Sequence, residues 1–445
     1  MAEELPGPAR FVQGLIDGED RPVPPSLRAT STVAHGDEDI PRSRYTSRAW
    51  HELEMERVWK RVWQMACREE DIPGIGDHVI YEVGDISLIV MRTADGIRAF
   101  HNSCLHRGTQ LRTTAGNVAE LRCPFHGFTW RLDGTLKEIP CAWDFPHVDP
   151  STFCLPEALT GTWGGFVFVN VDRDAAPLAE HLEILPSHFA DWPLEDRYTA
   201  AHVVRVVPCN WKVALEAFIE SYHTVAVHPQ LLRTTGDTLT EYDVYPGSRH
   251  ISRMITPIGV ASEHVDRVVP DEEILAAMFM TKDVDTTIPD GASARSVLAD
   301  RSRALLAREA GREIDITDCE AIDAIEYFVF PNFMPWPSYT TPLVYRFRPA
   351  GDDPDSSIMD VWLLAPVPAG GRPVAARAHV LGPDETWADA PELGYLGRIL
   401  NQDSSTLGRV QRGLKASAKP GVTLAHYQES RIRHFHQTLG EYIEG

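Results

Sequence analysis

The 445-residue sequence predicts an α+β protein with a small antiparallel β domain followed by a larger domain that mixes helices with a sheet. Two observations lead to this fold class. Between residues 77 and 172, alternating and β-branched segments are joined by turns such as Asp95-Gly96 and Asp133-Gly134. After residue 173, segments of helical period alternate with strand-like segments as far as the C-terminus. A chain of this length is long enough for two domains.

The elements follow in order along the chain. Residues 1–44 are rich in Pro, Gly and charge, so we expect an arm and linker with little regular structure. Residues 45–172 form the expected β domain, which opens with a helix over 46–65 that Ser47 can cap. Residues 173–445 form the second domain, where we expect helices at 208–226, 271–280, 295–310 and 391–415. The segments HISRMITPIGV, LVYRFRPAG and IMDVWLLAPVP are expected to be strands of one sheet.

The composition excludes several classes of partner. With 42 basic and 64 acidic residues the net charge is -22 and the pI is about 5.2, which argues against nucleic acid or an anionic membrane. No secretory signal and no apolar span of membrane length is evident, and seven irregularly spaced Cys indicate reduced thiols. We therefore expect a cytoplasmic enzyme of small molecules. Because no nucleotide-binding Gly motif is evident, its reducing equivalents are expected from another protein.

Two short motifs carry the first candidate metal site. Cys104-Leu105-His106 and Cys123-Pro124-Phe125-His126 are separated by sixteen residues, and each offers one thiolate and one imidazole. Common structural zinc sites instead pair Cys with Cys and His with His at short spacing. A two-iron, two-sulfur centre with two Cys ligands on one iron and two His ligands on the other fits this order better. A structural zinc site is the alternative.

The second candidate site lies in residues 208–230, PCNWKVALEAFIESYHTVAVHPQ. Glu216, Glu220 and His223 fall at i, i+4 and i+7 of the predicted helix and so share one side of it. His228 follows five residues after His223, next to Pro229, which ends the helix. An open-sided mononuclear iron would need two His and one carboxylate, and the candidate carboxylate is Asp403. Taken alone, Asp403 could equally be a solvated side chain or a helix cap.

These segments resemble a known family. CLHRG at 104–108 and CPFHGFTW at 123–130 resemble the cluster loops of Rieske proteins. NWKVALEAFIESYHTVAVHP and the D-x7-QRGL pattern at 403–414 resemble the iron-site segments of Rieske non-heme iron oxygenase large (alpha) subunits, the aromatic-ring-hydroxylating dioxygenase family. The resemblance implies an antiparallel β Rieske domain and a helix-grip-like catalytic domain with an antiparallel sheet flanked by helices. It implies a 2Fe-2S cluster that is bound by Cys104, His106, Cys123 and His126. It also implies a mononuclear Fe(II) that is bound by His223, His228 and Asp403.

The resemblance also implies an activity and partners. A terminal oxygenase would use O2, with electrons from a ferredoxin or reductase, to dihydroxylate, monohydroxylate or demethylate a small apolar molecule, aromatic or alicyclic. Glu220, where relatives commonly have Asp, would relay electrons and protons in a homotrimer, with or without small beta subunits. A local surplus of Lys and Arg in residues 101–140 predicts ferredoxin docking at Arg112 and Lys137. A Rieske-type electron-transfer protein and a structural zinc-binding protein are the alternatives, and neither needs the second site.

Overall fold

The computed structural model describes residues 5–31, 35–279 and 285–445. The chain forms two compact units. Unit 1 comprises Met1–His51, Leu182–Arg348 and Pro354–Gly445, and unit 2 comprises Glu52–His181 and Pro349–Asp353. Within the described residues, no helix is both long enough and apolar enough to cross a membrane.

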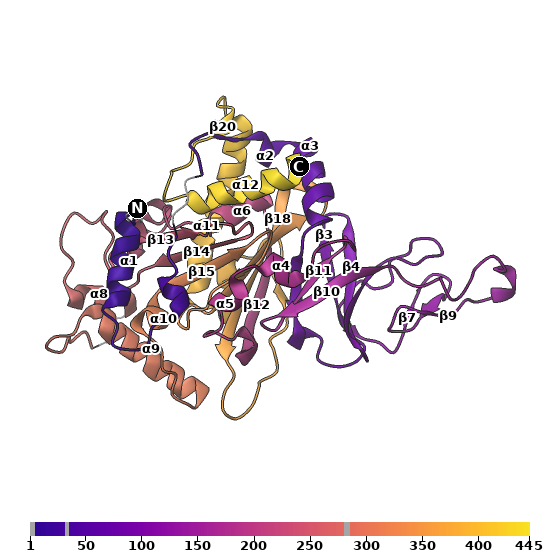
Figure 1. The fold of residues 1–445 in the computed structure, drawn as a ribbon, viewed down its shortest axis with the longest axis horizontal. Coiled ribbons are helices and arrows are strands. Elements are labelled where there is room, and N and C mark those ends of the chain that lie inside the picture. The colour runs from indigo at the N-terminus through magenta and orange to yellow at the C-terminus, as the bar shows by residue number, and fades with distance from the viewer. Residues whose placement is uncertain (1–4, 32–34, 280–284) are drawn as a thin grey trace. The chain divides into compact units, whose positions relative to one another are not determined.

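Unit 2 is built on an antiparallel sheet of seven strands in the order β2-β11-β10-β5-β4-β3-β6. A separate three-stranded sheet, β7-β8-β9, carries the second cluster motif beyond the end of the larger sheet (Figure 1). The small sheet packs through Leu121, Phe128 and Trp130 into a hydrophobic core with Ile89 and Phe100 of the large one. The strands are β2 Gln64–Arg68, β3 Asp77–Val83, β4 Ile86–Thr93, β5 Gly96–His101, β6 Gly116–Asn117, β7 Leu121–Arg122, β8 Thr129–Trp130, β9 Leu136–Glu138, β10 Glu157–Trp163 and β11 Phe166–Asn170.

Unit 1 contains a five-stranded sheet, β16-β17-β18-β12-β19, and a three-stranded sheet, β13-β14-β15. The pairs β16-β17, β12-β18, β13-β14 and β14-β15 are antiparallel, and β12 pairs with β19 in parallel. The expectation that residues 250–260 share one sheet with 343–366 is wrong, because β14 pairs with β13 and β15 instead. Apolar patterning marks a strand but does not name its partner. The strands are β12 Arg197–Val207, β13 Glu241–Val244, β14 Ile251–Thr256, β15 Ala324–Val329, β16 Met334–Pro335, β17 Leu343–Ala350, β18 Asp353–Pro366 and β19 His379–Val380.

The longer helices of unit 1 are α1 Gly7–Asp17, α8 Asp271–Phe279, α9 Ala294–Ala310, α11 Leu396–Ala416 and α12 Ser430–Glu444. In Figure 1, α12 and α11 lie close to α6 (Trp211–Glu216). The predicted helices at 271–280 and 295–310 are confirmed as α8 and α9 within one residue at each end. The helix expected from 391 begins only at Leu396, because Pro391 starts a separate turn and Gly394 has a φ of 54°.

The helix expected over 208–226 is broken. It consists of α6 and a single turn, α7 Thr224–Val227, with residues 217–223 between them outside regular helix. At the N-terminal end, the Ser47 hydroxyl accepts from the Trp50 amide and α3 Arg48–Glu54 follows, as predicted. The π-helical turn Met55–Trp59 continues it. The helix expected as far as residue 65 ends there, and residues 64 and 65 already belong to strand β2.

The arm at 1–44 has more structure than expected, because it begins with α1. Ala9, Val12 and Ile16 recur at helical spacing on its buried side, and prolines at the start of a helix are compatible with it. Beyond α1, Arg253 of β14 binds the carbonyls of Ser26 and Ala29 and forms ion pairs with Glu241 and Asp243. The arm is therefore fixed to the three-stranded sheet by a fully buried cation.

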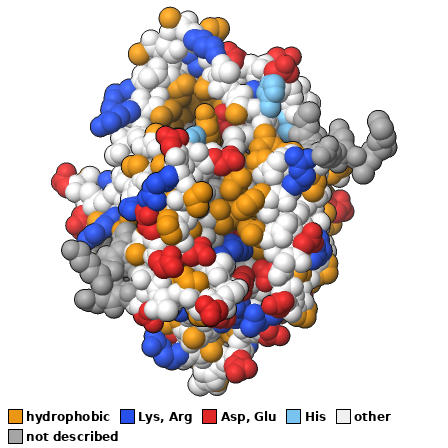
Figure 2. Space-filling model, turned by 90° about the vertical axis from the view of Figure 1, so that its left-hand side faces the viewer, with side chains coloured by type: hydrophobic (Ala, Val, Ile, Leu, Met, Phe, Trp, Pro, Cys, Tyr) orange, Lys and Arg blue, Asp and Glu red, His pale blue; other side chains and the backbone are white. Residues whose placement is uncertain are grey.

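The surface of unit 1 on the side of α1 and α8 carries both signs of charge. Figure 2 shows acidic side chains interspersed with Lys and Arg over this face, and hydrophobic side chains gathered between them. The net charge of -22 is thus spread out on this face instead of forming one acidic patch.

Candidate metal centres

The two cluster motifs of unit 2 fold into loops with equivalent hydrogen bonds. The Cys104 amide donates to Thr109 O at 2.9 Å and the Gly108 amide donates to Cys104 O at 2.9 Å. In the second loop, Cys123 N donates to Phe128 O at 2.8 Å and Gly127 N to Cys123 O at 3.1 Å. Gly108 and Gly127 have φ of 73° and 79°, a conformation in which glycine is strongly preferred. The same backbone geometry therefore presents each Cys-x-His pair.

The two histidines of these loops lie close together, and so do the two cysteines. The rings of His106 and His126 have centroids 4.7 Å apart, and the Cys104 and Cys123 thiols are close enough to hydrogen-bond. Both thiols are buried, whereas His126 is exposed. Burial raises the pKa of Cys123, but backbone N–H groups of Phe125 and His126 outweigh it and lower that pKa. Two thiolates and two imidazoles, with backbone donors directed at sulfur, form a donor set that fits a Rieske cluster.

Aromatic residues support the first loop. The Phe128 ring stacks on His106 with centroids 4.6 Å apart and an interplanar angle of 10°, and Trp130 is fully buried behind it. Arg107 lies over the Phe125 ring at 5.4 Å. Arg107, Phe128 and Trp130 therefore pack against the cluster loops.

The second predicted site comes together in unit 1 from two distant segments. His223 and His228 flank α7, and Asp403 lies on α11, 175 residues after His228. One ligand atom from each of the three residues lies within 4.8 Å of the others. His228 Nε2 is 2.8 Å from Asp403 Oδ1, and His223 Nε2 is 3.5 Å from the same oxygen. Two imidazoles and one carboxylate are the donor set of an open-sided non-heme iron site.

Hydrogen bonds orient both imidazoles so that Nε2 faces Asp403. The His228 Nδ1–H group donates to Gln402 Oε1 at 3.0 Å, because an amide oxygen can only accept. The His223 Nδ1–H group donates to Glu220 Oε1 at 2.7 Å. In both rings Nε2 is left as the ligand atom, which is how metal-binding histidines are commonly held. Glu220 therefore lies beside the site, in contact with a ligand instead of among the ligands.

The electrostatics of the site favour positive charge at its centre. Burial lowers the pKa of His223, but hydrogen bonds from its imidazolium to Asp403 and Glu220 outweigh burial and raise that pKa to about 10. Burial raises the pKa of Asp403, and the two histidines more than reverse this and lower it. The two carboxylates thus stabilise a cation here, whether a proton or a metal ion carries the charge.

Two glutamines that support the site were not predicted from the sequence. Gln402 accepts from His228 and from Gln230 Nε2, the latter at 2.7 Å. Gln411, two turns after Asp403 on α11, is buried and accepts from the Asn210 amide at 3.1 Å, where Asn210 caps α6. Gln411 therefore fixes the start of α6 to the helix that carries Asp403. The QRGL motif in the sequence contains Gln411, but the sequence does not indicate that Asn210 is its partner.

Aromatic side chains gather next to the site. Phe218, from the segment after α6, packs on Tyr345 and Phe347 with ring centroids 5.0 and 5.3 Å apart, and Trp336 packs on Tyr345 at 5.8 Å. Tyr345 is fully buried, and burial together with the charges of Asp403 and Glu326 raises its pKa well above the usual range. Tyr345 therefore lies within electrostatic reach of Asp403, the predicted iron ligand.

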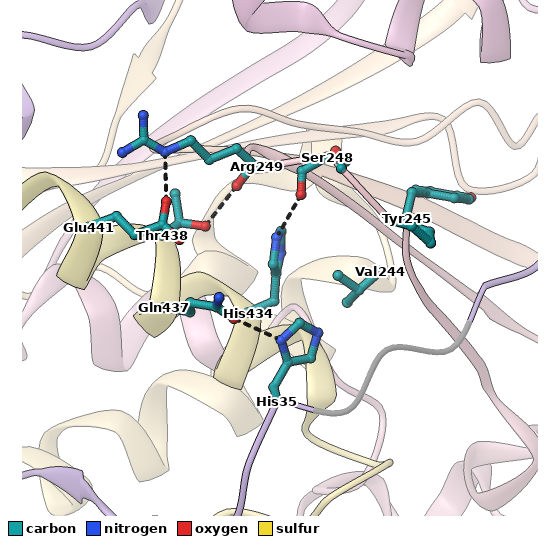
Figure 3. A pocket seen from close by; sticks show the side chains of 11 residues that line it. His35, Val244, Tyr245, Ser248, Arg249, His434, Gln437, Thr438 and Glu441 are labelled. Atoms are coloured by element: carbon teal, nitrogen blue, oxygen red, sulfur yellow. Dashed lines mark hydrogen bonds and ion pairs between the residues drawn. The ribbon is translucent and has the colours of Figure 1, made fainter.

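A cavity of about 360 Å³ lies elsewhere in unit 1, between α12 and the turn after β13 (Figure 3). Its lining residues include none of the predicted ligands. Its polar groups largely bond one another, with His35 on Gln437, His434 on the Ser248 carbonyl and Arg249 on Glu441. His436, two residues from His434, instead contacts Glu216 at 2.7 Å, so the two histidines face different sides of α12.

Comparison with known proteins identifies the family of the chain. Residues 189–445, more than half of the chain, match the model of the family described as ring hydroxylating alpha subunit (catalytic domain). The chain belongs to the ring-hydroxylating alpha subunit family. Residues 62–149 of this alpha subunit match the Rieske [2Fe-2S] domain. Its cofactors are accordingly a Rieske 2Fe-2S cluster and a mononuclear iron, as predicted, and both donor sets fit them.

Curated relatives of this alpha subunit include subunits named as monooxygenases of quaternary ammonium compounds and subunits named as dioxygenases of aromatic compounds. The glycine betaine monooxygenase oxygenase subunit of Chromohalobacter salexigens is 32% identical over 231 residues, 50% of each chain. The chlorobenzene dioxygenase subunit alpha of Cupriavidus sp. is 33% identical over 187 residues, 40% of this chain and 42% of the relative. The matched part thus spans about half or less of these relatives' length.

Solved structures agree on the fold. The quaternary ammonium Rieske monooxygenase CntA in complex with L-carnitine has a TM-score of 0.63 at 18% identity, covering 91% of this chain and 95% of that one. Naphthalene 1,2-dioxygenase with indole bound has a TM-score of 0.62 at 18% identity, covering 93% and 94%. The predicted α+β fold class is confirmed.

Proposed function

We propose that this alpha subunit is the terminal oxygenase of a multicomponent system, and that His223, His228 and Asp403 hold its iron. The observation that carries the proposal is the convergence of these three side chains within 4.8 Å from segments 175 residues apart. An electron-transfer protein or a structural zinc protein would have no use for such a site. When bound, the cluster and the iron supply stepwise electron delivery and reductive activation of dioxygen.

Cys104, His106, Cys123 and His126 are proposed as the cluster ligands, with electrons arriving from a ferredoxin or a reductase. We assign the cluster to residues 45–172, the iron to residues 173–445, and leave 1–44 as an arm. Glu220 is proposed as the link between the two centres in a cytoplasmic homotrimer, because its carboxylate holds the Nδ1–H group of an iron ligand at 2.7 Å. The protein's own task at the iron is to orient the two imidazoles so that Nε2 of each faces the metal.

For the substrate we propose a small quaternary ammonium compound that is hydroxylated or oxidatively demethylated. The aromatic group of Phe218, Trp336, Tyr345 and Phe347 supports this, because aromatic faces bind quaternary ammonium ions. The relatives that act on glycine betaine and carnitine point the same way. Oxygenation of an aromatic ring is the second candidate, favoured by the 33% identity to the chlorobenzene dioxygenase subunit.

Two measurements test the proposal. Metal and sulfide analysis of anaerobically prepared protein should give three irons and two sulfides per chain, and zinc alone or two irons with full activity would refute it. Oxygen uptake with a surrogate reductase should then be coupled to loss of glycine betaine, choline or carnitine. Coupled uptake with arenes only would select the second candidate.

A further inference from the structure

The irregular segment 217–223, between α6 and α7, has its backbone bound from outside at two points. The carbonyl of Ile219 accepts from Arg431 Nη1 at 3.2 Å. The amide of Ser221 donates to the Tyr242 hydroxyl at 2.9 Å. These two groups immediately precede and follow Glu220, so both peptide bonds next to its Cα are held by side chains that lie far away in the sequence.

Arg431 is itself held rigidly. Its side chain is fully buried in the first turn of α12, where Nε donates to Ser252 Oγ at 3.1 Å and Nη1 lies 3.0 Å from Glu326 Oε1. Glu326 is also fully buried. A planar guanidinium with partners on several sides has little freedom, and its charge is balanced inside the protein.

The sheet register explains why these partners face the same segment. Tyr242 of β13 pairs with Met254 of β14, and Met254 pairs with Glu326 of β15. Residues directly opposite on adjacent strands share one face of a sheet. Ser252, two residues before Met254, lies on that face as well. The β13-β14-β15 sheet therefore offers one row of side chains to the segment that contains Glu220.

We propose that Tyr242 and Arg431 are positioning residues that fix the Glu220 carboxylate on Nδ1 of His223. This positioning role matters for activity only under the proposed function, in which Glu220 links the cluster to the iron. The proposal goes beyond that function by naming the residues that hold Glu220 in place. A functional side chain must be held within about 0.5 Å of its working geometry, and a segment without regular helix does not provide this by itself. The two backbone contacts supply the missing constraint.

The first test uses Tyr242→Phe, which removes one hydroxyl and leaves the ring. Tyr442→Phe is the matched control, since the Tyr442 hydroxyl contacts His250 Nε2 at 2.8 Å instead of Tyr242 or residues 217–223. Amide hydrogen exchange of the holoprotein should rise roughly two- to tenfold in a peptide covering 217–223 for Tyr242→Phe only, the range that corresponds to one lost hydrogen bond. Unchanged exchange there, or an equal rise in the control, would overturn the proposal.

The second readout is the rate at which the chemically reduced cluster is reoxidised in a single turnover with substrate and O2. Tyr242→Phe should slow it about fivefold or more, while iron content and the cluster's EPR spectrum stay unchanged. Normal reoxidation combined with faster exchange would also overturn the positioning role. Arg431→Met leaves Glu326 buried without its cation and can unfold the protein, so Arg431→Met is combined with Glu326→Met. This double variant should reproduce both effects, and Arg431→Lys should show smaller ones.

Glu220→Gln separates the two ideas. If this variant reoxidises its cluster at the normal rate, the proposed role of Glu220 as the link fails. The exchange measurement then still decides by itself whether Tyr242 and Arg431 hold the segment.

Discussion

Replacing Asp403 with Ala removes the proposed iron ligand that lies outside the 208–228 segment. Asp403 is only 4% exposed and its Oδ1 lies 2.8 Å from His228 Nε2 and 3.5 Å from His223 Nε2. Two unit charges about 4 Å apart in such a partly shielded environment interact by roughly 4 kcal/mol, and Fe(II) carries two charges. We therefore expect Asp403→Ala to weaken iron binding by at least ~1,000-fold and to abolish oxygenation.

Substitutions of two residues close to Asp403 on α11 are expected to have smaller effects on iron affinity. Gln402→Leu leaves the ligands intact but removes the acceptor for His228 Nδ1–H, and loss of such a supporting contact typically costs about 10- to 100-fold in metal affinity. Ser405→Ala is the control on the same helix, because Ser405 is exposed. Within the described part of the chain, its hydroxyl donates a hydrogen bond only to the backbone carbonyl of Gln402. We expect it to bind iron within about twofold of the unsubstituted protein.

Competition with a coloured iron chelator under anaerobic conditions measures the affinity of each variant, and the visible absorption of the cluster reports that unit 2 is intact. Iron affinity within tenfold of normal in Asp403→Ala would refute the assignment of Asp403. Equal losses in Asp403→Ala and Ser405→Ala would show that the helix is damaged and that the charge argument is wrong.

Three further outcomes are expected. Burial lowers the pKa of His434 from 6.5 to about 4, so protonation favours the unfolded state and stability falls as pH drops from about 6.5 towards 4. His434→Gln should cut the loss of unfolding free energy between pH 7.5 and pH 5, measured with urea, by about 2 kcal/mol. Arg253→Met leaves Asp243 and Glu241 buried without their cation, and should cost about 3–5 kcal/mol in the same assay; a loss below 1 kcal/mol would contradict the buried network. Tyr345→Leu should raise KM for a quaternary ammonium substrate roughly 3- to 30-fold in oxygen-uptake assays, whereas an unchanged KM would place the cation elsewhere.

The sequence predicted the parts of both sites whose residues are close together or have a strongly constrained chemistry. Both cluster loops, the His223 and His228 pair and the helices at 271–279 and 294–310 could be predicted for this reason. The break at 217–223 could not, because it depends on Arg431 and Tyr242, which reach that segment only in the folded chain. The same holds for Gln402, whose role follows from the direction in which α11 presents it.

The N-terminal helix was missed for a different reason. Its apolar residues Ala9, Val12 and Ile16 were visible at helical spacing, but the prolines around them were interpreted as signs of an irregular arm. Pro8 stands in the first turn, where no amide hydrogen bond is lost. In this case the pattern was sufficient and the interpretation was wrong.

The three-stranded sheet of unit 1 has a consequence for how this region can vary. On β14, Met254 and Ser252 face the Glu220 segment, whereas Arg253 between them faces the opposite way and binds the arm. Because alternate residues of a strand point to opposite faces, one inserted or deleted residue would exchange the two sets. We therefore expect relatives to differ here by substitution and hardly ever by length. Libraries that alter substrate range should likewise keep residues 251–256 at fixed length and place insertions in loops.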